Sequence, residues 1–150
     1  MGSLYLCVME TVKFHRGRLI DHVQLVVRDL AAAKRFYGAL FGVIGIPFGG
    51  EGPGFFWADE VCVSTADSPA AAGQTTGRIH LAFQANDRTT VDRFHAETIR
   101  AGGKDNGAPG ERPYHPGYYA AFVLDPDGNN IEVVFHGPAK RSASSVEITI

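Results

Sequence analysis

Cysteine is scarce in this sequence, which has only Cys7 and Cys62 among its 150 residues. Two cysteines cannot build the disulfide framework of small secreted proteins, so we expect reduced thiols and a cytoplasmic protein. A single bridge between the two is the alternative that the sequence leaves open. Long hydrophobic runs are also lacking, because the apolar stretch from Leu4 to Met9 is much shorter than a bilayer span. We therefore expect no membrane partner.

An excess of charge of one sign is missing as well. The chain has 14 Lys and Arg against 16 Asp and Glu, and its longest basic cluster is Lys140-Arg141. Nothing here neutralises a run of phosphates, so we expect no nucleic-acid partner. Hydrophobic residues make up 45% and charged residues 20%, which is typical of a globular domain. Residues 1–150 are expected to form one domain, since a chain of this length buries roughly 70% of its unfolded surface.

The sequence contains an internal repeat with a constant offset of 58 residues. Coincidences at one offset indicate a duplicated module, which fixes the architecture before any single element is assigned. The matching positions are His22 with His80, Asp29 with Asp87, and Arg35-Phe36 with Arg93-Phe94.

Each repeat predicts a βαβββ module. Alternating strands are expected at 19–27 and 78–85. Asp29 and Asp87 each precede an expected helix as its N-cap, and the helices are expected to end near Gly42 and Gly102-Gly103. Further strands are expected at 43–48, 54–58 and 61–65, and then at 104–108, 118–124 and 130–135. The tail alternates at Val146, Ile148 and Ile150, which predicts an additional edge strand.

These elements predict an α+β fold. Module 1 spans about 19–66, a linker 67–77, module 2 about 78–136, and a tail 137–150. The two tandem βαβββ modules are expected to curve their mixed sheets into a cupped, barrel-like cavity.

Strand alternation places polar side chains on the sheet faces away from the helices. His22 and Gln24 lie opposite the apolar Val23, Leu25 and Val27, and His80 and Glu132 fall on the corresponding face of the second module. A carboxylate in an otherwise apolar strand is costly to bury unless it is paired or bound to a metal. Two imidazoles and one carboxylate suit a divalent ion of Fe, Mn, Zn or Ni and leave coordination positions open. Structural histidines are the alternative.

Three segments resemble the glyoxalase, bleomycin-resistance and extradiol-dioxygenase family, the vicinal oxygen chelate superfamily. They read Asp-His-Val-Gln-Leu-Val-Val-Arg-Asp-Leu from 21, Arg-Ile-His-Leu-Ala-Phe from 78 and Leu-Asp-Pro-Asp-Gly-Asn-Asn-Ile-Glu from 124. The resemblance covers about 19–136 and implies a metal held by His22, His80 and Glu132. Cys62 falls near the position of a further ligand in glyoxalase I-type members, where it is either a ligand or a small buried apolar residue.

The resemblance implies a metal-dependent enzyme acting on a small substrate that chelates the ion through vicinal oxygens. Lyase or isomerase, dioxygenase and thiol-transferase chemistry all stay open. The alternative is a metal-free ligand-binding protein of the bleomycin-resistance type. Both functions imply a homodimer, with the metal site either within one chain or shared between two.

Other side chains are candidates for contact with the substrate. The aromatic segment 112–119 precedes a strand that borders the expected cavity, and its phenol and imidazole groups suit acid or base roles. Aromatics that merely cover the core are the alternative, as is a solvated tail position for Arg141. The expected catalytic residues are Tyr114, His115 and Tyr119, and the expected substrate-binding residues are Gln24, Trp57, Tyr118 and Arg141.

Overall fold

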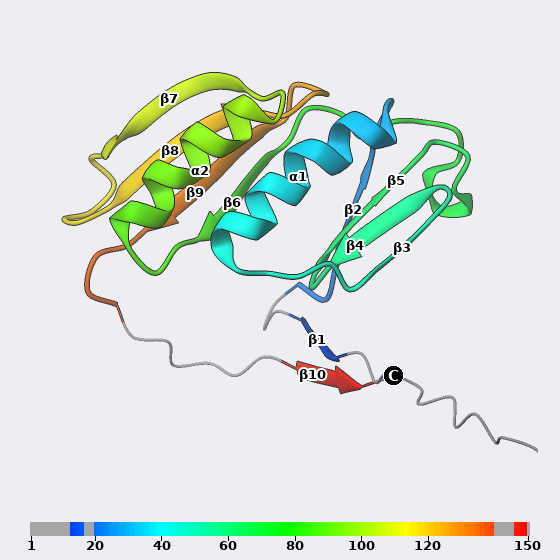
Figure 1. Ribbon diagram of the computed structural model, residues 1–150, viewed down its shortest axis with the longest axis horizontal. Coiled ribbons are helices and arrows are strands. Elements are labelled where there is room, and N and C mark those ends of the chain that lie inside the picture. Colours follow the sequence, from blue (N-terminus) through cyan, green and yellow to red (C-terminus); the bar gives the residue numbers. More distant parts are fainter. Residues whose placement is uncertain (1–12, 17–19, 140–145, 150) are drawn as a thin grey trace, which may run out of the picture.

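Two four-stranded sheets and two long helices make up the computed structural model, which describes residues 13–16, 20–139 and 146–149 (Figure 1). The first module contains β2 (Val23–Val26), α1 (Leu30–Ile44), β3 (Gly50–Gly52), β4 (Phe55–Ala58) and β5 (Val61–Ser64). The second contains β6 (His80–Gln84), α2 (Arg88–Arg100), β7 (Lys104–Glu111), β8 (Tyr119–Leu124) and β9 (Asn130–Phe135). The α+β fold with tandem βαβββ modules is therefore confirmed.

The two sheets have the same topology. Their strand orders are β2-β5-β4-β3 and β6-β9-β8-β7. In each sheet the first strand pairs in parallel with the last strand of its module, and the other pairs are antiparallel. The expected linker contains one short 3-10 helix, Pro69–Ala71. The repeat in the sequence thus corresponds to a repeat in three dimensions.

Both predicted helix N-caps are present. Asp29 accepts a hydrogen bond from the Ala32 N–H at 3.0 Å, and Asp87 accepts one from the Thr90 N–H at 2.7 Å. These bonds satisfy backbone donors that have no partner within the first turn of a helix.

The predicted end of the first helix, and the strand expected at 43–48, are wrong. The helix continues through the exposed Gly42 and ends at Gly45, which has a φ of 78° and donates its N–H to the Phe41 carbonyl. Burial of Phe41 and Val43 against the core offsets the cost of about 1 kcal/mol that a glycine adds inside a helix. The left-handed conformation is needed at Gly45, where glycine adopts it without strain.

The modules share one hydrophobic core. Figure 1 shows α1 and α2 side by side, and the repeat-related Phe36 and Phe94 are both fully buried. The Phe41 and Phe83 rings meet at 6.2 Å between centroids, which joins the first module to the second. Each sheet contributes one face to this core. The opposite face of each sheet carries the polar side chains described below.

A separate two-stranded sheet joins segments near the two ends of the chain. β1 (Lys13–Arg16) and β10 (Val146–Thr149) pair antiparallel, with Lys13 opposite Thr149. The strand predicted in the tail therefore exists but pairs with β1 instead of extending a four-stranded sheet. Within the described parts of the chain, neither long helix has the length and apolar character needed to cross a bilayer.

Candidate functional site

His80 and Glu132 form a pair on the sheet of the second module. The strands β6 and β9 are parallel neighbours, with His80 opposite Asn130 and Ala82 opposite Glu132. Because side chains two residues apart share a face of a strand, His80 and Glu132 lie on the same side. His80 Nε2 is 2.9 Å from Glu132 Oε2, and Glu132 is only 3% exposed. The structure thus brings together two of the three residues that alternation placed on the polar faces.

The imidazole of His80 has a fixed orientation. Its Nδ1 is 3.0 Å from the Asn130 carbonyl oxygen, which can only accept, so Nδ1 carries a proton and donates. The other nitrogen, Nε2, then faces the carboxylate. A histidine that binds a metal commonly donates its second ring nitrogen to a backbone carbonyl in this way. Together with a carboxylate oxygen 2.9 Å away, Nε2 offers a donor set that fits a divalent transition metal.

Tyr118 holds the other oxygen of the same carboxylate. Its hydroxyl donates to Glu132 Oε1 at 2.5 Å, so the two oxygens of Glu132 have separate partners. Burial, followed by this hydrogen bond, raises the pKa of the Tyr118 phenol well above its usual value. The phenol therefore stays protonated and keeps donating at neutral pH. Sequence reasoning assigned Tyr118 to substrate binding, and the structure places it against Glu132.

His22 lies apart from this pair. It precedes β2, and its Nδ1 is 2.6 Å from Asp21 Oδ1. Together with Gln24, Phe55, Trp57 and Cys62 it lines a cavity of about 280 Å³, called here the His22 hollow. Over the described ranges, no three His, Cys, Asp or Glu side chains are placed to hold one metal ion. A single chain therefore brings together two of the three predicted ligands and leaves His22 elsewhere.

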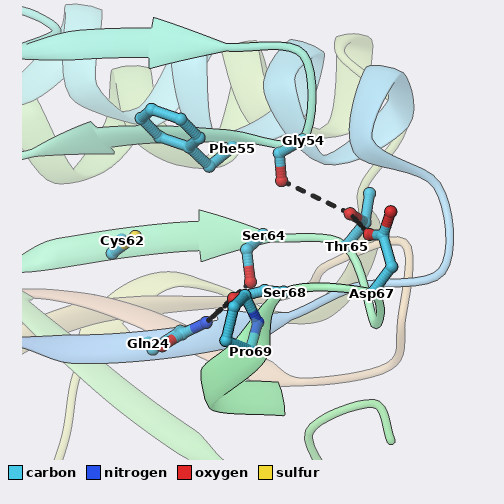
Figure 2. A pocket seen from close by; sticks show the side chains of 9 residues that line it. All are labelled: Gln24, Gly54, Phe55, Cys62, Ser64, Thr65, Asp67, Ser68 and Pro69. Carbon is cyan, nitrogen blue, oxygen red and sulfur yellow. Dashed lines mark hydrogen bonds between the residues drawn. The ribbon is translucent and has the colours of Figure 1, made fainter. Parts of the chain in front are cut away.

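A second cavity, of about 370 Å³, lies beside the first on the same sheet and is called the Gln24 hollow (Figure 2). Gln24 Nε2 donates to Ser64 Oγ at 2.8 Å and to Ser68 Oγ at 3.3 Å. Phe55 and Cys62 line both hollows. Cys62 is partly buried and faces these cavities, opposite Gln24 and Trp57 in the strand register. The predicted binding residues Gln24 and Trp57 thus belong to one face of the first module.

The predicted aromatic segment divides between two faces of the second sheet. The rings of Tyr114 and His115 contact Tyr118 at centroid distances of 4.9 and 5.3 Å, so they adjoin the carboxylate pair through Tyr118. Tyr119 points toward α2, where its hydroxyl donates to Asp92 at 2.7 Å. The structure does not bring Tyr119 together with His80 and Glu132. Tyr118 directly precedes β8 and Tyr119 begins it, and the side chains of these neighbouring tyrosines point to opposite faces.

His136, which was not singled out from the sequence, contacts a predicted site residue. His136 Nδ1 is 2.9 Å from His115 Nε2, and the two rings are stacked with centroids 5.2 Å apart. His136 directly follows the strand that carries Glu132, and alternation places both on one face. This alternation was the signal in the sequence that could have placed His136 on the face of the site. Arg141 lies outside the described residues.

The comparisons with known proteins agree with this fold. The model of the Glyoxalase/Bleomycin resistance protein/Dioxygenase superfamily matches residues 19–133, which include both modules. The chain belongs to this superfamily. The resemblance stated from the sequence is therefore confirmed, and proteins of this superfamily bind small molecules and typically a divalent metal.

Several known proteins are similar to most of the chain. A glyoxalase/bleomycin resistance protein from Albidiferax ferrireducens is 32% identical, with a TM-score of 0.64 over 77% of this chain and 97% of its own. A virulence protein from Salmonella typhimurium is 29% identical over 76% of this chain and 81% of its own. A glyoxalase-related enzyme from Fulvimarina pelagi shares the fold at 22% identity, with a TM-score of 0.67 over 87% of this chain and 98% of its own.

Proposed function

We propose that this member of the superfamily is a homodimeric, divalent-metal-dependent enzyme whose small substrate binds the ion through two adjacent oxygens. The observation that carries the proposal is the geometry of His80 and Glu132, whose donor atoms are 2.9 Å apart. The Asn130 carbonyl fixes the imidazole and the Tyr118 hydroxyl fixes the carboxylate. A buried carboxylate held in this way is prepared for a cation, because an ion would offset the cost of its burial.

The third ligand in this proposal is His22 of a second copy of the chain. His22 is absent from the pair's surroundings within one chain, and its side chain is 58% exposed. In a two-fold dimer the contacts are reciprocal, so the first module of each copy meets the second module of the other and two equivalent sites form. The His22 hollow and the exposed Phe55 provide part of the surface for such a contact.

A bound Fe, Mn, Zn or Ni ion would act as a Lewis acid that stabilises negative charge developing on the substrate oxygens. The chain's own groups then have distinct tasks. His80, Glu132 and the second copy's His22 hold the ion, and Tyr118 keeps the carboxylate oriented. Tyr114 and His115 supply exchangeable protons beside Tyr118. Gln24 and Trp57 contact the substrate from the opposite module.

The class of reaction follows from the metal in this proposal. Iron favours a dioxygenase, whereas nickel, zinc or manganese favours lyase, isomerase or thiol-transferase chemistry. A metal-free ligand-binding protein is the second candidate. It is supported by the two adjoining hollows of about 370 and 280 Å³, which Phe55 lines together with polar groups.

The proposal is tested by measuring transition metals per chain in untagged protein purified without added metal or chelator. Plasma mass spectrometry is expected to find close to one ion per chain, and His80→Ala and Glu132→Ala are expected to abolish it. His95→Ala is the matched control, because His95 pairs with Asp105 at 2.8 Å outside the site. Wild-type protein that holds no metal and takes up none on reconstitution would overturn the enzyme proposal and favour the metal-free binding protein.

A further inference from the structure

Arg112 lies on the same sheet face as the carboxylate pair, one aromatic ring away from it. In the register of the second sheet, Phe122 is opposite Glu132 on one side and Gly107 on the other. The rings of Phe122 and His80 are stacked with centroids 6.0 Å apart and an interplanar angle of 26°. The guanidinium carbon of Arg112 is 5.4 Å from the centroid of that Phe122 ring. His80 and Arg112 thus contact one ring.

The guanidinium of Arg112 is held in place by the backbone. Its Nη2 donates to the Ala108 carbonyl at 2.7 Å and its Nη1 to the Glu111 carbonyl at 3.3 Å. A Cβ at Gly107 would lie 3.4 Å from Nη2, and one at Gly110 would lie 3.0 Å from Nη1. Register shifts between β7 and β8 flank Gly107. The absence of side chains at Gly107 and Gly110 therefore provides the space in which the Arg112 side chain folds back along β7.

No carboxylate among the described residues neutralises the charge of Arg112. Both of its hydrogen bonds go to uncharged carbonyls, and no carboxylate in the ranges 13–16, 20–139 and 146–149 forms an ion pair with it. The neighbouring carboxylate of Glu111 bonds to Arg88 at 2.7 Å instead. A guanidinium has five N–H donors, so Arg112 has donors left for a ligand.

We infer that Arg112 recognises an anionic group on the substrate, namely a carboxylate or a phosphoryl group. The inference rests on the proposed function and adds the substrate class: a molecule that chelates the metal through adjacent oxygens and carries an oxyanion further along. A guanidinium binds either oxyanion through two parallel hydrogen bonds, which an ammonium cannot reproduce. The Phe122 ring between Arg112 and His80 provides an apolar surface for the part of the substrate that joins the two groups.

Probes that differ only in this anionic group test the inference on metal-reconstituted full-length protein. The probes are catechol, 3,4-dihydroxybenzoate and 3,4-dihydroxyphenylphosphonate, with affinity measured by isothermal titration calorimetry. A charge-assisted hydrogen bond predicts that at least one charged probe binds about tenfold tighter than catechol. Arg112→Met is expected to remove this preference and leave catechol affinity and metal content unchanged. Arg93→Met, on the exposed side of α2, is the control. An unchanged preference in Arg112→Met would overturn the inference.

A second measurement separates failure of this inference from failure of the metal proposal. Metal-free protein labelled with ¹⁵N is titrated with benzoate and with inorganic phosphate, and the Arg112 Nε–H signal is assigned by its loss in Arg112→Lys. A saturable shift with either anion supports the site even in protein that binds no metal, and the anion that causes it identifies the class of oxyanion. The absence of a shift with both anions would overturn the inference even in protein that binds metal.

Discussion

The Tyr37 hydroxyl donates a 2.5 Å hydrogen bond to Asp125 Oδ2 and thereby joins α1 of the first module to the β8–β9 turn of the second. Tyr37 is fully buried and Asp125 is 5% exposed. The other oxygen of Asp125 accepts the N–H groups of Asp127 and Asn129 at 2.9 and 2.8 Å. Burial is the main cause that raises the pKa of Tyr37, so this phenol remains a donor. The turn that leads to the Glu132 strand thus depends on the other module.

Replacing Tyr37 with phenylalanine should destabilise the protein. The change leaves a buried carboxylate oxygen with one donor fewer, and we expect the free energy of unfolding to fall by about 1–3 kcal/mol. Urea denaturation followed by circular dichroism measures this. Tyr114→Phe is the matched control, since Tyr114 is 70% exposed and a surface change of this kind costs less than about 0.5 kcal/mol. Equal stability of the two variants would contradict the account.

Tyr118→Phe should weaken metal binding without abolishing it. The substitution removes the donor to Glu132 Oε1, and loss of such a supporting hydrogen bond typically lowers metal affinity by about 10–100-fold. Competition with a fluorescent chelator measures the affinity. The control is Tyr119→Phe, whose hydroxyl bonds Asp92 near α2. An affinity that is unchanged in Tyr118→Phe would show that Tyr118 does not position Glu132.

The N-cap at Asp87 should make stability depend on pH in the acid range. Hydrogen bonding to Thr90 lowers the pKa of the folded carboxyl below its usual value of 3.8. The unfolded chain therefore takes up this proton at a higher pH than the folded chain. The cap stabilises the fold fully above the usual pKa of 3.8, and this stabilisation is lost as the pH falls through the lower pKa of the folded carboxyl. An asparagine at this position can also serve as the N-cap, and its amide side chain does not titrate. Thermal melts between pH 2 and 6 should show a shallower acid decline for Asp87→Asn than for wild type, and parallel declines would contradict this.

Two glycine-to-alanine changes should have opposite effects on stability. A Cβ at Gly103 would lie 2.5 Å from Val123 Cγ1 and 2.8 Å from the Thr98 carbonyl, so Gly103→Ala should cost about 1–3 kcal/mol. At Gly42, inside α1, no neighbouring atom lies within 4 Å of such a Cβ. Gly42→Ala should therefore stabilise the protein by up to about 1 kcal/mol. Chemical denaturation measures both, and the same sign for the two would refute the packing argument.

Local patterns in the sequence predicted much of the fold and part of the site. The period of two along a strand placed His80 and Glu132 on one face, and the repeat located both N-caps. Features that depend on contacts between distant segments could not be predicted from these local patterns. The end of α1 depends on how well Phe41 and Val43 pack, and the position of Arg112 depends on the register shifts in β7. In the proposed dimer, the location of His22 relative to the pair depends on how two copies assemble, and alternation within one chain carries no information about that.

Complementation between variants tests most directly whether two copies of the chain share each metal site, as we propose. Differently tagged His22→Ala and Glu132→Ala chains are co-expressed, the mixed dimer is isolated, and its metal is quantified beside each variant homodimer. In a shared site, the His22→Ala chain still supplies His80 and Glu132 while the Glu132→Ala chain supplies His22. We expect one ion per mixed dimer, two per wild-type dimer and none in either variant homodimer. A mixed dimer without metal, alongside a fully loaded wild type, would contradict it.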